Sequence, residues 1–67
     1  MAMTHAREQL IQVERRIASA QERIAWHKKN IEELTREGRE TGLAAAMLNS
    51  WERILLLFQQ QRERMKN

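Results

Sequence analysis

Histidine, glutamate and serine are the residue types in this 67-residue sequence that could serve metal binding or catalysis. The two imidazoles, His5 and His27, lie far apart in a chain that has no cysteine and no aspartate. First-row metal ions in proteins are held by three or four such ligands. We therefore expect no metal site and no cofactor, with a site shared between copies across a symmetric interface as the remaining alternative.

The sequence contains no arrangement of nucleophile, acid and base that is suitable for catalysis. Ser19 and Ser50 stand outside any nucleophile motif, and the sequence contains no glycine-rich phosphate loop. The glutamates have basic partners at helical spacing, as Glu33 has in Lys29 four positions earlier. The sequence therefore predicts a protein that is not an enzyme, and we assign no catalytic residue.

Composition and spacing predict that these side chains are carried by helices. Proline and cysteine are absent, and only two glycines occur. Apolar residues recur at alternating intervals of three and four, which is the a/d pattern of a coiled coil. This row consists of Met3, Ala6, Leu10, Val13, Ile17, Ala20, Ile24, His27, Ile31 and Leu34. We expect a first helix over about residues 4–37, with Thr4 as its N-cap and Gly38 after its end.

The two glycines mark a turn at residues 38–41, after which Thr41 is the expected N-cap of a second helix over about residues 42–66. Helices joined by so short a connection pack antiparallel. The predicted fold class is therefore all-α. It is an antiparallel two-helix hairpin of coiled-coil type, one domain over residues 1–67, that assembles into a homo-oligomeric helical bundle.

The position of the turn predicts the core. Residues that face each other should have numbers that sum to about 79, so that Ala20 lies opposite Phe58 and Val13 opposite Met65. The predicted intrachain core is Leu10, Val13, Ile17, Ala20, Ile24, His27, Ile31, Leu34, Leu48, Trp51, Leu55 and Phe58. His27 has two interpretations, a semi-polar filler that also fixes the register, which we favour, or a pH switch in a desolvated layer.

Both helices carry more apolar surface than a hairpin can cover. A second apolar row flanks the core row of the second helix, and residues 1–12 extend beyond the end of that helix. Association of two hairpins would cover both surfaces, so we expect a homodimeric four-helix bundle. The expected interface consists of Met3, Leu10, Ile11, Leu43, Met47, Ile54 and Leu57. Trp26 and Leu56 fall outside both rows, and are either singly exposed or contacts for a further protomer.

The net charge of +3 raises the question of nucleic-acid binding. The 12 basic and nine acidic residues are interspersed, whereas a phosphate-binding surface needs a stripe of one sign. Candidate contacts are Arg15, Arg16, Arg23, Arg62 and Arg64. We therefore expect protein interaction or scaffolding by self-association, with an unidentified protein partner left open. The alternative is a small RNA- or DNA-binding regulator built as a dimeric four-helix bundle.

Membrane association is not expected. The longest apolar run, Ile54–Phe58, is far shorter than the roughly 20 residues that cross a bilayer. The first residues also lack the pattern of a signal peptide, so we expect a cytoplasmic protein. A membrane-surface role for the second helix is an alternative, but the same face is needed for the core.

Thirteen residues from the two helices and the turn carry a family resemblance: Glu14, Arg15, Arg16, Ile17, Gln21, Ile31, Leu34, Gly38, Thr41, Met47, Leu48, Trp51 and Glu52. In these positions the chain resembles a group of very short bacterial helical-hairpin proteins with no assigned function. The resemblance covers residues 14–58, and Gln59–Gln61 and the basic tail depart from it. It implies a hairpin fold and brings no catalytic or binding residues.

Overall fold

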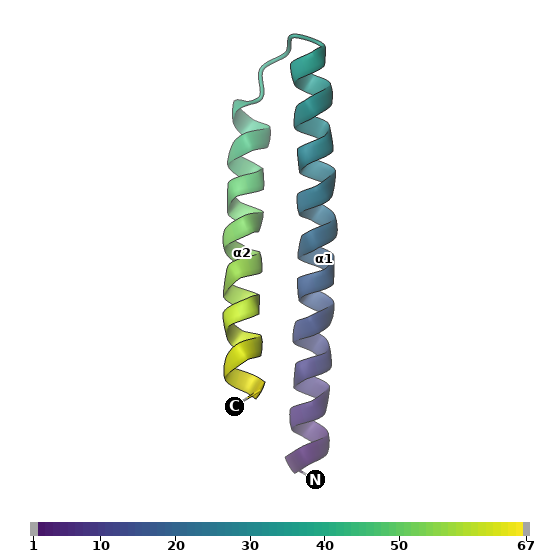
Figure 1. Ribbon diagram of the computed structural model, residues 1–67, viewed down its shortest axis with the longest axis vertical. Coiled ribbons are helices and arrows are strands. Elements are labelled where there is room, and N and C mark those ends of the chain that lie inside the picture. Colours follow the sequence, from purple (N-terminus) through teal and green to yellow (C-terminus); the bar gives the residue numbers. More distant parts are fainter. Residues whose placement is uncertain (1, 67) are drawn as a thin grey trace.

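The computed structural model describes the backbone of residues 2–66 and the side chains of residues 6–66. It contains two helices, α1 (Ala2–Arg36) and α2 (Gly42–Lys66), and no strand within the described range. The helices lie side by side and run in opposite directions (Figure 1). The predicted all-α hairpin is therefore confirmed, whereas its assembly into a bundle stays a prediction.

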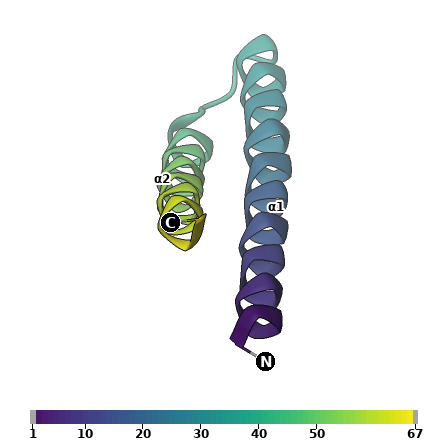
Figure 2. The same cartoon turned by 60° about the horizontal axis from the view of Figure 1, so that its bottom comes forward.

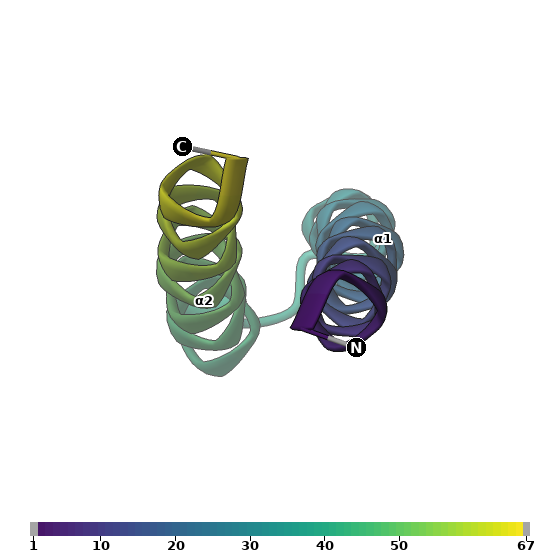
Figure 3. The same cartoon turned by 90° about the horizontal axis from the view of Figure 1, so that it is seen from below.

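The hairpin is a thin rod that measures 55 × 14 × 13 Å. Helix α1 has 35 residues and α2 has 25, so the N-terminal end of α1 runs past the end of α2 (Figures 1 and 2). Seen from below, the two helices are inclined to each other (Figure 3). The first turns of α1 consequently have no part of α2 beside them, which is the overhang that the sequence predicts.

The connection between the helices is short, and hydrogen bonds mark both of its ends. Gly38 has a φ of 71°, a conformation that residues with a Cβ rarely adopt. Its N–H donates to Thr35 O at 3.1 Å, and Arg39 N–H donates to Leu34 O at 2.9 Å, which together form a Schellman motif. At the other end, Thr41 O accepts the first bond of α2 from Ala45 N–H at 2.8 Å, as the carbonyl of an N-cap residue does.

The helix bounds differ slightly from the predicted ones. Helix α1 begins at Ala2, so Thr4 lies inside the helix and is not its N-cap. The same helix ends at Arg36, one residue earlier than predicted, because the Schellman bonds already close the chain around Gly38.

The core follows one face of α1. Its buried residues are Val13, Ile17, Ala20, Ile24 and His27, and Ala44 joins them from α2. The remaining predicted core residues are half-buried: Leu10, Ile31, Leu34, Leu48, Trp51, Leu55 and Phe58. They are not fully covered because a rod of two helices shields each seam residue from one direction only. Ala44 lies on the core row of α2 but was absent from our predicted core.

The register agrees with the predicted pairing. Val13 and Met65 line one shallow groove between the helices. Ile24 and Leu55 line a second groove. Each of these pairs joins residues whose numbers sum to 78 or 79, close to the sum that the position of the turn predicts.

The two glycines provide a matched test of the turn. Gly38→Ala should lower the free energy of unfolding by about 1–2 kcal/mol, because alanine is strained at positive φ. Gly42→Ala is the control, since Gly42 has open space around its Cα and ordinary φ. It should stabilise the hairpin by about 0.4–1 kcal/mol. Urea denaturation at one protein concentration measures both changes, and equal effects of the two substitutions would contradict the assigned turn.

A second matched pair tests the closeness of the helices. Ala20 is only 1% exposed, so Ala20→Leu should push the helices apart and cost about 1–3 kcal/mol of unfolding free energy. Ala18 lies on the exposed side of the same helix, and Ala18→Leu should change that free energy by less than about 0.5 kcal/mol. Thermal unfolding followed by circular dichroism provides the comparison. An Ala20→Leu variant as stable as the unsubstituted chain would show that the helices pack less closely at Ala20 than the structure indicates.

Candidate interaction site

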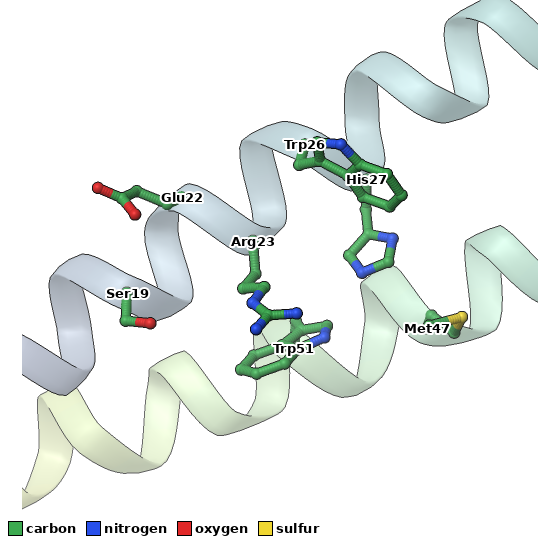
Figure 4. Close-up of a pocket in the computed structure, with 7 residues that line it drawn as sticks. All are labelled: Ser19, Glu22, Arg23, Trp26, His27, Met47 and Trp51. Atoms are coloured by element: carbon green, nitrogen blue, oxygen red, sulfur yellow. The ribbon is translucent and has the colours of Figure 1, made fainter.

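A groove of about 710 Å³ lies between the middle of α1 and the first half of α2. It is lined by Ser19, Glu22, Arg23, Trp26, His27, Met47 and Trp51 (Figure 4). Residues three or four positions apart share one side of a helix, which explains why Ser19, Arg23 and Trp26 border the same groove. The groove therefore combines aromatic, apolar and charged side chains from both helices.

His27 lies at the bottom of this groove, between the helices (Figure 4). Its side chain is only 4% exposed, and its ring meets Trp26 edge-on, with centroids 5.0 Å apart and planes at 81°. Its Nδ1 atom is buried and has no hydrogen-bond partner among the described residues. A buried polar atom of this kind costs about 1–3 kcal/mol unless a partner reaches it. The structure thus places His27 in the seam, and its role as register residue or pH switch stays a prediction.

Arg23 and Trp51 connect the two helices across the groove. The Arg23 guanidinium carbon lies over the Trp51 ring, 5.5 Å from the centroid (Figure 4). Such a cation–π contact is worth about 0.5–1 kcal/mol at an exposed site. The sequence pattern did not predict this contact. The available signal was that Arg23 stands one helical turn before His27, and that His27 and Trp51 have numbers that sum to 78, close to the predicted sum for facing residues.

A second groove continues the first toward the turn. Its lining residues are Trp26, His27, Asn30, Leu34, Glu40, Leu43, Ala44 and Met47. Trp26, His27 and Met47 belong to both grooves, so the two form one surface. Trp26 is 60% exposed there and Leu43 is 78% exposed. We call the surface formed by Trp26, Leu43, Met47 and Trp51 the Trp26 face.

The residues predicted to form the oligomer interface have different degrees of exposure. Ile11, Leu43, Met47 and Leu57 are exposed, whereas Leu10 and Ile54 are half-buried. The side chain of Met3 lies outside the described residues. Leu43 and Met47 belong to the Trp26 face. Ile11 stands two positions before the buried Val13 and so lies on the far side of α1.

The two apolar residues outside the predicted rows, Trp26 and Leu56, are both exposed, but they are in different places. Trp26 borders the groove of Figure 4. Leu56 lines another groove, together with Ile24, Lys28, Glu52, Arg53, Leu55 and Gln59. No residue is common to the linings of these two grooves, so Leu56 does not belong to the Trp26 face.

The candidate nucleic-acid contacts are also in different environments. Arg15, Arg16 and Arg64 are exposed. Arg23 is positioned over Trp51, and Arg62 is half-buried with its Nε atom shielded from solvent and unpartnered among the described residues. The acidic Glu22 lines the same groove as Arg23. The structure does not gather the five arginines into a single groove.

The described part of the chain contains neither a metal-ligating cluster nor a membrane-spanning helix. No group of three or more histidine, cysteine, aspartate or glutamate side chains is arranged there to hold a metal ion. Neither of the two helices, over its described length, is long and apolar enough to cross a membrane.

The cation–π contact can be tested with two arginines of the same helix. Arg23→Gln should lower the free energy of unfolding by about 0.5–1 kcal/mol, because it removes the charge over the Trp51 ring. Arg15→Gln removes an equal charge from an exposed position and should leave the stability nearly unchanged. Urea denaturation monitored by tryptophan fluorescence measures both, and equal stability of the two variants would rule out a contribution from the contact.

Comparison with known proteins identifies no relative of this chain. No protein-family model matches the chain, and no curated protein or solved structure is significantly similar to it. The resemblance to short bacterial helical hairpins therefore stays a prediction.

Proposed function

We propose that this chain is a non-enzymatic interaction or scaffolding protein that acts by self-association, most simply as a homodimeric four-helix bundle. The observation that supports the proposal most directly is the amount of apolar side chain outside the seam. Among residues 6–66, six large apolar residues are exposed: Ile11, Trp26, Leu43, Met47, Leu56 and Leu57. Several of them adjoin each other on the Trp26 face, and contiguous apolar surface of this kind marks interaction sites.

The total surface area supports the same proposal. The chain exposes 5679 Å². A compact monomer of 8.0 kDa would expose about 4,450 Å², so the excess is about 1,200 Å². A standard protein interface covers about 800 Å² on each partner. The excess is therefore large enough for one such interface.

Nucleic-acid binding is the competing function, and the charge arrangement favours it less. Arg23 and Glu22 line one groove with opposite charges, and Arg62 is half-buried. Only Arg15, Arg16 and Arg64 of the five candidates stay exposed without an assigned contact to an aromatic ring. A regulator of this size would need a continuous basic surface that contacts several phosphates.

Sedimentation equilibrium tests the proposed self-association, because it reports mass independently of the elongated shape. Across micromolar concentrations we expect a mass of at least twice the 8.0 kDa of one chain. A folded species at the monomer mass over the whole range would contradict the proposal.

Titration with a labelled RNA hairpin and a labelled DNA duplex separates the two functions. We expect no binding even at low ionic strength. Binding that weakens steeply as salt is added would instead support the nucleic-acid role, because phosphate contacts release counterions.

A further inference from the structure

We propose that the Trp26 face is the surface through which two copies of this chain associate, with Trp26 of each copy inserted into the groove of the other. This inference rests on the proposed self-association and specifies its surface and symmetry. It differs from the predicted interface, which left out Trp26 and included Ile11 on the far side of α1.

One face of the hairpin carries both the projecting Trp26 side chain and the groove. Trp26 is 60% exposed, and it borders the 710 Å³ groove that also has Arg23, Met47 and Trp51 in its walls (Figure 4). In a dimer with two-fold symmetry, the same patch must be complementary to itself. A protruding side chain beside a groove on the same face satisfies that requirement. Tryptophan is also the type of residue that most often anchors an interface.

The charges on this face favour the same arrangement. Glu22 and Arg23 are neighbours in the sequence and line the same groove, with no other charged residue in its lining. Two-fold packing of this face can therefore bring Glu22 of one copy to Arg23 of the other, and vice versa. Opposite charges placed in this way specify the orientation of the copies.

The polar lining of the groove favours one kind of occupant. Four of its seven lining residues are polar or charged, namely Ser19, Glu22, Arg23 and His27. A hydrocarbon surface cannot satisfy such groups. A second copy brings polar groups to the same face, namely the Ser19 hydroxyl, the Asn30 amide and the Trp26 indole N–H. The occupant favoured by this chemistry is thus a second protein surface of the same kind, not a lipid.

Two exposed apolar residues provide a matched test. Trp26→Ala removes a side chain from the Trp26 face, and Leu56→Ala removes one from another groove, where Leu56 is 54% exposed. Neither residue is in the buried core, and alanine favours helix, so both variants should stay folded by circular dichroism. We expect Trp26→Ala to raise the dimer Kd by at least about tenfold and Leu56→Ala by less than about threefold.

A spectroscopic measurement tests the same point with Trp26 left in place. Trp51→Phe leaves Trp26 as the single tryptophan of the chain. As the concentration rises through the range in which the mass doubles, the Trp26 emission should shift to shorter wavelength, because its exposed ring becomes covered. Emission that stays at the wavelength of an exposed tryptophan through that range would overturn the proposal.

The outcomes separate this inference from the broader function. If the unsubstituted chain stays at the monomer mass, the proposed self-association fails. If it dimerises and Trp26→Ala and Leu56→Ala have equal effects, association uses another surface and only the Trp26 proposal fails. A shift of the Trp26 emission that requires phosphatidylglycerol vesicles, and does not occur on dimerisation, would also overturn the proposal and assign the face to a lipid surface.

Discussion

Two helices alone have a single line of contact, and this constraint determines most of the structure. Each seam residue is covered by the facing helix from one side, so only residues at the centre of the contact become buried. These are small or β-branched side chains of α1, together with His27 and Ala44. The larger residues of α2, including Phe58 and Leu48, are merely half-buried. Such a rod cannot enclose its apolar content, whereas domains normally bury it between packed layers.

Small residues determine where the helices approach and where a groove opens. Ala20 is 1% exposed, and Ala44 is the buried residue of α2 near His27. Trp26 stands beside the seam and is 60% exposed, while Trp51 extends to meet Arg23. The groove of Figure 4 lies between these aromatic rings, so the features proposed for association follow from the packing of the hairpin itself.

The fold was predictable because it depends on spacing alone. The alternating intervals of three and four define the helices, and Gly38 and Thr41 define the turn, which together determine the register. The Trp26 face was not predictable in the same way. Heptad assignment places Trp26 outside the seam and treats Arg23 as a solvated charge, because it considers direction around the helix and not the reach of long side chains. Whether Trp26, Leu43 and Met47 border one surface depends on the relative rotation of the two helices, which only the structure provides.

Folding and association should be thermodynamically linked in this molecule. A chain of 67 residues buries a smaller fraction of its surface on folding than a larger domain does, so binding to a second copy adds substantially to the stability of the folded state. On the proposed assembly, a seam residue such as Ala20 influences dimerisation without contacting the partner, because the spacing of the helices sets the width of the groove that receives Trp26. The charged groups of the Trp26 face, in contrast, specify the orientation of the two copies. Apolar contacts alone would tolerate several orientations, whereas Glu22 and Arg23 must each find a matching group, and this requirement selects one arrangement from many.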